Sequence, residues 1–65
     1  MAYQLFFEIG GSRKFYGEYR DIDQMLYFFN ELMTKGAIST DGEKNIVQYP
    51  ASRVERVEVI CIGDI

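Results

Sequence analysis

The stretch EIGGSRKFYG, residues 8–17, combines residue types that could bind a phosphate. Its two glycines leave backbone N–H groups accessible, and two cations follow them, so a loop here could hold an anion. A nucleotide-binding P-loop needs G-x-x-x-x-G-K-[ST] between a strand and a helix, and this stretch has neither the spacing nor the following helix. The candidate anion site therefore consists of the four residues Gly10, Gly11, Arg13 and Lys14.

A β-hairpin explains the same stretch without any ligand. The segments YQLFFEI and RKFYGEYR both alternate between two faces, which is typical of strands. Pairing their apolar faces in phase puts Phe7 opposite Phe15 and Phe6 opposite Tyr16. This register leaves residues 10–12 as a three-residue loop in which glycine takes the left-handed position. We favour the hairpin over the anion site.

No other group of residues carries a catalytic or metal-binding pattern. The chain has no histidine and a single cysteine, which excludes a zinc site of the usual Cys/His kind. Its serines have no histidine to activate them, and no two carboxylates are spaced for acid–base work. Cys61 lies in an apolar strand end, so we expect a buried and unreactive thiol. The sequence therefore predicts a protein that is not an enzyme and has no cofactor or metal.

A helix is predicted over residues 22–35, in the segment DIDQMLYFFNELMTKG. Asp21 is a suitable N-cap, with Gln24 completing a capping box, and Gly36 is suited to the position just past the last turn. One apolar stripe follows the helical period and should face the core. Its members are Ile22, Met25, Leu26, Phe29, Leu32 and Met33.

The rest of the chain predicts further strands. A short strand at residues 37–39, a turn around Asp41-Gly42 and a returning strand precede Pro50, which should close that strand. The last strand is expected at residues 53–62. The fold class is therefore α+β in a single domain, residues 1–65. One helix packs on one face of an antiparallel sheet in the order ββαββ, or ββαβββ if the strand at 37–39 is counted.

Size and charge constrain the partners. A 65-residue chain buries a small core, and the lack of disulfides and metal ligands leaves oligomerisation as its support, so we expect a homodimer. The net charge of −3 argues against nucleic-acid binding. The start of the chain lacks a cationic secretory signal and no apolar run could span a membrane, so we expect a cytoplasmic protein.

The chain has more aromatic residues than its core needs. Five Tyr and five Phe occur in 65 residues, and the helix stripe with the inner strand faces already fills a core. A cluster of apolar residues left on the surface of a small protein usually marks an interface, to which Tyr, Phe and Arg contribute most. The residues predicted to contact a partner are Phe6, Tyr16, Tyr27, Phe28, Arg56 and Ile60. Of these, Phe6, Tyr16 and Ile60 are expected on the outer face of the sheet, and Phe28 and Tyr27 on the flank of the helix. A homodimer that packs sheet to sheet would explain the outer face equally well.

The layout resembles small proteins encoded by phages and mobile elements of Gram-positive bacteria. The resemblance rests on the N-terminal hairpin, the helix DIDQMLYFFNELMTKG and the closing segment DGEKNIVQYPASRVERVEVI. It covers nearly the whole chain as an order of elements, and it carries no catalytic residue across. It implies a protein that binds and blocks a host protein, for example in an anti-defence role, or one that sequesters a nucleotide signal.

Three function classes follow. The leading hypothesis is a non-enzymatic inhibitor that contacts a host protein, in the cytoplasm of the host cell. The alternative is a nucleotide sponge that uses Arg13 and Lys14, helped by Arg53 or Arg56, with Tyr16 or Tyr19 stacking on the base. The third is a small DNA-binding regulator, against which the acidic composition argues.

Overall fold

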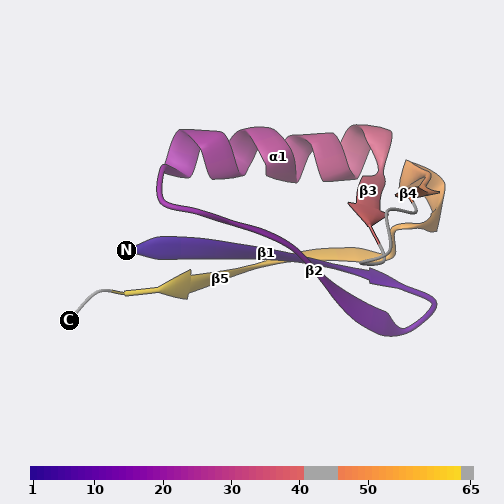
Figure 1. Ribbon diagram of the computed structural model, residues 1–65, viewed down its shortest axis with the longest axis horizontal. Coiled ribbons are helices and arrows are strands. Elements are labelled where there is room, and N and C mark those ends of the chain that lie inside the picture. Colours follow the sequence, from indigo (N-terminus) through magenta and orange to yellow (C-terminus); the bar gives the residue numbers. More distant parts are fainter. Residues whose placement is uncertain (41–45, 64–65) are drawn as a thin grey trace.

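The computed structural model describes residues 1–40 and 46–63, in which one helix lies across one face of a three-stranded antiparallel sheet (Figure 1). The strand order is β2-β1-β5, so the first strand is central and pairs with the last. The predicted α+β class with a single helix on one face is confirmed. The elements are β1 (Ala2–Ile9), β2 (Ser12–Tyr19), α1 (Ile22–Lys35) and β5 (Arg56–Ile62).

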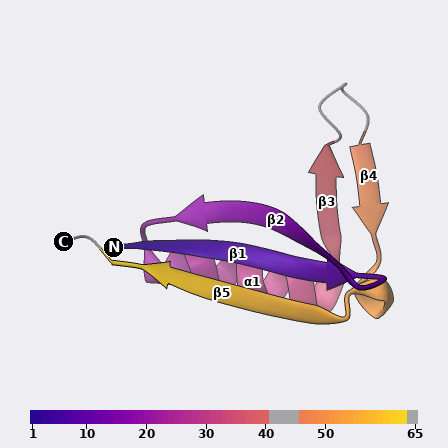
Figure 2. The same cartoon turned by 90° about the horizontal axis from the view of Figure 1, so that it is seen from below.

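A second, two-stranded sheet lies at one end of the molecule. Strands β3 (Ala37–Thr40) and β4 (Ile46–Tyr49) pair with each other and project beyond the three-stranded sheet (Figure 2). The prediction of one sheet was therefore wrong, although both short strands exist. Pro50 follows β4 as predicted, and a 3₁₀ turn, Ala51–Arg53, delays the start of the last strand. The turn predicted around Asp41-Gly42 lies outside the described residues.

The hairpin of β1 and β2 has a shorter turn than predicted. Ile9 pairs with Ser12, which leaves a two-residue turn, and Gly10 and Gly11 both have positive φ, 57° and 79°. This is the geometry of the tight hairpin turns that glycine favours. The prediction of a three-residue loop was wrong. It paired the apolar faces in phase over the whole hairpin and did not allow for the preference of two adjacent glycines for a two-residue turn.

A β-bulge restores the predicted register further from the turn. Phe6 pairs with Phe15, whereas Leu5 pairs with Gly17, so Tyr16 is the extra residue on β2. The two-residue turn puts Phe15 opposite Phe6 on the outer face of the sheet, with 55% of its surface exposed, and directs Tyr16 toward the helix. The prediction that Tyr16 lies on the outer face beside Phe6 was wrong because it assumed a three-residue turn. The bulge then brings Tyr19 opposite Tyr3, on the helix side of the sheet.

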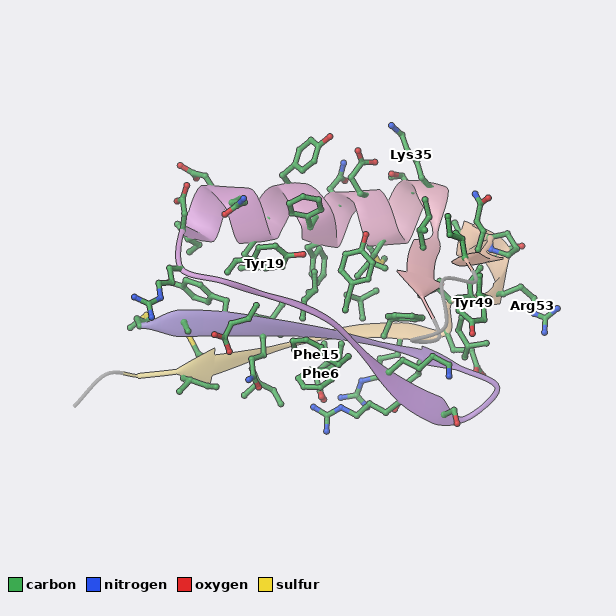
Figure 3. All side chains as sticks on the ribbon, viewed as in Figure 1. Phe6, Phe15, Tyr19, Lys35, Tyr49 and Arg53 are labelled. Atoms are coloured by element: carbon green, nitrogen blue, oxygen red, sulfur yellow. The ribbon has the colours of Figure 1, made fainter. Side chains whose placement is uncertain are left out.

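The core lies between α1 and the inner face of the sheet. Leu5 and Phe7 of β1 and Leu32 of the helix are almost completely buried, and each such side chain stabilises the fold by about 1.5–3 kcal/mol. Tyr19 lies between the helix and the sheet, over Gly17, where an added Cβ would come within 2.5 Å of the Tyr19 hydroxyl oxygen (Figure 3). Gly17 thus leaves room for this ring.

The helix begins and ends where the sequence predicts. The Asp21 side chain accepts a hydrogen bond from the N–H of Asp23, 3.1 Å away, which caps the first turn. Its buried face differs from the prediction, because Phe28 packs against the core whereas Ile22, Leu26 and Met33 are about half exposed. The stacking of Phe28 on Tyr19, with ring centroids 5.0 Å apart, explains the rotation of the helix toward β2.

Cys61 is exposed, contrary to the prediction of a buried thiol. It lies near the end of β5, an edge strand in the described part of the chain, opposite Tyr3. Because no further strand covers that edge there, an apolar sequence around the cysteine did not ensure its burial. Among the described residues, no helix is long and apolar enough to cross a bilayer.

Gly36 connects the helix to the second sheet through a conformation that requires glycine. Its φ is +92°, and an added Cβ would lie 2.0 Å from the carbonyl oxygen of Tyr49. We predict that Gly36→Ala lowers the free energy of unfolding by at least about 2 kcal/mol, because left-handed strain and backbone overlap add together. Urea unfolding followed by circular dichroism would measure this.

Gly10→Ala is the matched control, because Gly10 also has positive φ but an added Cβ there meets no atom within 4 Å. We expect this variant to lose only about 1 kcal/mol. Equal losses for the two variants would contradict a role for close backbone approach at Gly36.

Candidate functional site

The predicted contact residues separate onto two surfaces. Phe6, Arg56 and Ile60 lie on the outer face of the sheet, by the pairing of β1 with β5. Tyr16, Tyr27 and Phe28 lie on the helix side and line a cavity of about 300 Å³. This division was expected except for Tyr16, which was predicted on the outer face and lies on the helix side.

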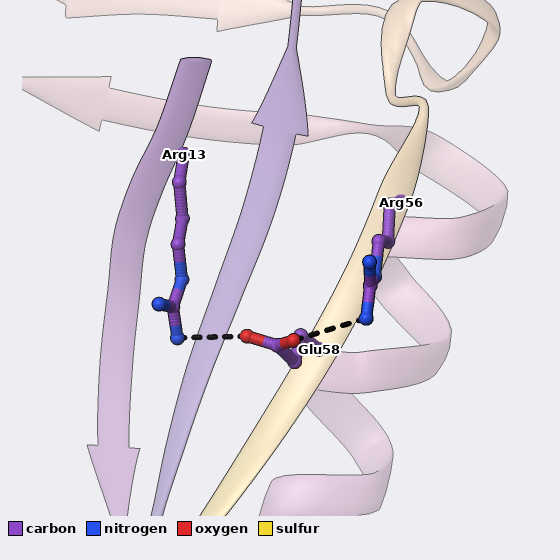
Figure 4. Close-up of polar contacts among 3 residues, drawn as sticks. All are labelled: Arg13, Arg56 and Glu58. Atoms are coloured by element: carbon purple, nitrogen blue, oxygen red, sulfur yellow. Dashed lines mark hydrogen bonds and ion pairs between the residues drawn. The ribbon is translucent and has the colours of Figure 1, made fainter. Parts of the chain in front are cut away.

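The outer face carries a closed network of charges around two aromatic rings. Glu58 accepts from Arg13 at 2.7 Å and from Arg56 at 3.1 Å, across three strands (Figure 4). The Arg13 guanidinium also lies 4.0 Å from the centroid of the Phe6 ring, which contacts Phe15 edge-on at 5.4 Å. Phe6 and Phe15 point away from the helix (Figure 3). Arg13, Arg56 and Glu58 thus pair with each other within the chain.

The predicted anion site is not assembled. Arg13 pairs with Glu8 on the outer face, whereas the next residue, Lys14, turns inward to 6.0 Å from the centroid of the Tyr49 ring. The N–H of Gly11 donates to a carboxylate oxygen of Glu55, 3.0 Å away. The chain's own carboxylate therefore occupies the position at the turn where an external anion was predicted.

The cavity lies beside the C-terminal half of α1, on the side of β2. The helix contributes ring faces and a charged pair, the bulge in β2 contributes Tyr16, and the second sheet closes the end. Ring centroids of Tyr27 and Phe28 are 5.1 Å apart, and those of Tyr16 and Phe28 are 6.5 Å apart. The full lining consists of Tyr16, Tyr27, Phe28, Glu31, Lys35, Gly36, Ile38 and Gln48.

Glu31 is the acidic group of this cavity, which we call the aromatic pocket. Its side chain is 21% exposed, and it forms an ion pair with Lys35 at 3.3 Å, whose own side chain is 77% exposed. The hydrogen bond from the Tyr27 hydroxyl, helped by Lys35, lowers the pKa of Glu31 below its ordinary value. The same hydrogen bond, together with the negative charge of Glu31, raises the pKa of Tyr27. The carboxylate is thus held in its charged form among aromatic rings.

Sequence reasoning missed five of the eight residues that line this pocket. These are Glu31, Lys35, Gly36, Ile38 and Gln48, none of which was among the predicted contact residues. The spacing of Glu31 and Lys35, four positions apart on a helix, signalled their ion pair. The contribution of Ile38 and Gln48 depends on where the second sheet lies relative to α1, which no local pattern indicates.

The pocket has the make-up of a binding site. Ligand sites are concave and mostly apolar, with a few polar groups, and this volume is at the small end of their range. It suits one side chain or a small molecule. In the described part of the chain, no three residues among His, Cys, Asp and Glu are grouped to hold a metal ion.

The chain was compared with protein-family models, curated proteins and solved structures. No family model, no curated protein and no solved structure matches the chain.

The shift in the pKa of Glu31 is testable. We predict that Tyr27→Phe raises the pKa of Glu31 toward its ordinary value of 4.5, because the largest cause of the lowering is removed. Carboxyl carbon shifts in an NMR titration would measure it. Lys35→Gln should cause a smaller rise. An unchanged pKa in the Tyr27→Phe variant would show that the hydrogen bond does not form in solution.

The sign of the effect on stability follows from linkage. The lowered pKa of Glu31 stabilises the fold above the ordinary carboxyl pKa, and this contribution is lost as the pH falls through the lowered value. The raised pKa of Tyr27 stabilises the fold below 10.0, its ordinary value, and this contribution is lost as the pH rises through the raised value.

Proposed function

We propose that this protein is a non-enzymatic binding protein whose aromatic pocket accepts a side chain of a partner protein. The observation that carries the proposal is the convergence of Tyr16, Tyr27 and Phe28 on one open cavity. Exposed Tyr and Phe side chains around a depression are the usual centres of binding energy at protein interfaces. Tyr27 has 59% of its surface exposed, so it can contact a partner without first leaving the core.

The partner we propose is a bacterial host protein, blocked by this contact. The resemblance of the layout to small phage and mobile-element proteins supports an inhibitory, anti-defence role. Binding by contact alone is compatible with the described part of the chain, where Glu58 pairs with Arg13 and Arg56, and Glu31 pairs with Lys35. The proposal places the partner against the helix and the second sheet, and leaves the outer face of the three-stranded sheet free.

The test compares two exposed aromatic residues on opposite faces. Tyr27 is 59% exposed at the pocket and Phe15 is 55% exposed on the outer face, so Tyr27→Ala and Phe15→Ala are matched variants. We predict that Tyr27→Ala weakens binding of the partner roughly 30-fold, as loss of a central aromatic residue does, whereas Phe15→Ala leaves it unchanged. Native mass spectrometry of tagged protein from bacterial cells would identify the partner, and calorimetry would measure both affinities.

Loss of binding with Phe15→Ala but not with Tyr27→Ala would move the interface to the outer face and contradict the proposal. Phage plating on cells that express the wild type or Tyr27→Ala would then report inhibition. We expect protection of the phage by the wild type alone.

Self-association is a separate proposal, and it concerns the opposite flank of the helix. Because Phe28 stacks on β2, the half-exposed residues Ile22, Leu26 and Met33 lie on the flank toward β5. In the described residues β5 has no second neighbour, and its last four residues carry no charge. We propose that a second copy covers this flank and edge, which would extend the sheet across a two-fold axis.

We predict a dimer in light scattering coupled to size exclusion. Leu26→Glu should make the protein monomeric, because it buries a charge in the proposed contact. Gln24→Glu adds the same charge on the opposite flank and should leave the dimer intact. A monomeric wild type, or a dimer that survives Leu26→Glu, would contradict this surface.

A further inference from the structure

The aromatic pocket presents aromatic rings and a carboxylate to the same small volume. Tyr27 and Phe28 precede Glu31 by four and three positions on α1, so their rings and the carboxylate lie along one side of the helix. The faces of aromatic rings carry partial negative charge and attract cations. A carboxylate beside them adds a full negative charge. Together these groups favour a positively charged ligand.

The present partner of the carboxylate can be displaced. Lys35 pairs with Glu31 at 3.3 Å, but its side chain is 77% exposed and points away from the sheet (Figure 3). Exposed Lys–Glu pairs within a helix are weak, because the ammonium group keeps most of its hydration. A cation whose shape fits the pocket better could therefore replace Lys35 as the partner of Glu31 with little loss of free energy. The Lys35 side chain would then be fully hydrated.

The outer face of the same protein shows how these groups bind a guanidinium. Arg13 lies 4.0 Å from the centroid of the Phe6 ring while it pairs with Glu58 at 2.7 Å. One planar cation thus lies over a ring and also pairs with a carboxylate (Figure 4). The pocket has the ring and the carboxylate of this arrangement but holds no arginine of the described chain.

We propose that the aromatic pocket binds the guanidinium of an arginine side chain on the partner protein, stacked on a pocket ring and paired with Glu31. This inference rests on the proposed function. Arginine fits better than lysine, because its planar group stacks on rings and forms two parallel hydrogen bonds with a carboxylate. The net charge of −3 also favours association with a basic surface.

The first experiment uses N-acetyl-arginine amide as the probe and N-acetyl-citrulline amide as its neutral isostere. In NMR spectra of the folded protein, arginine amide should shift the signals of Glu31, Gly36 and the Tyr27 ring, and citrulline amide should not. Glu31→Gln should weaken binding by about 10-fold or more, since the ion pair becomes a neutral hydrogen bond. Lys35→Met removes the competing cation and should strengthen binding by up to about 5-fold.

Glu58→Gln is the matched control, because it removes an arginine-bound carboxylate on the outer face. It should leave probe binding unchanged. Equal shifts with citrulline amide, or binding that survives Glu31→Gln, would overturn the inference.

The partner protein then separates this inference from the proposed function. If Tyr27→Ala abolishes partner binding and Glu31→Gln does not, the pocket binds the partner without arginine, so only the inference fails. If neither variant affects binding, the proposed function fails as well. Loss in both variants, with a drop of about 10-fold or more for Glu31→Gln, supports both.

Discussion

The pairing of β1 with β2 is the constraint on which the other features depend. A two-residue glycine turn fixes the pairing near the turn, where Ile9 faces Ser12, and a register shift beyond Phe6 lets Leu5 and Gly17 share the inner face. The shift leaves Tyr16 as the extra residue. The turn puts Phe15 on the outer face and Tyr16 against the helix, and the inserted residue brings Tyr19 to the helix side as well. Together the turn and the bulge decide which aromatic rings belong to which surface.

The helix was predictable because its signals are local. Asp21 and Gly36 mark its ends through backbone conformations that depend on neighbouring residues alone. Which flank of the helix is buried was not predictable in the same way. Phe28 and Leu26 lie on opposite sides of the apolar stripe, and only the position of Tyr19, set by the pairing of the strands, decides between them.

Three residues of the candidate site were predicted, although the reasoning placed one of them on the wrong face of the sheet. Tyr16, Tyr27 and Phe28 were chosen as aromatic residues left over from the core, with Tyr16 assigned to the wrong face. They are brought together by the two-residue turn, which directs Tyr16 toward the helix, and by the second sheet, whose direction is set by the conformation of Gly36. The position of the second sheet relative to the helix produces no periodic pattern in the sequence. Ile38 and Gln48 were therefore not predicted as pocket residues.

The pairing of the first strand with the last has a consequence for how the chain folds during synthesis. Ala2 lies opposite Ile62, so the central strand gains its second neighbour only after β5 has left the ribosome. Until then the hairpin and the helix can form, but one side of β1 is an open edge of exposed backbone groups. A nascent chain halted before β5 would present this edge to other proteins in the cell, and the emergence of β5 would close it.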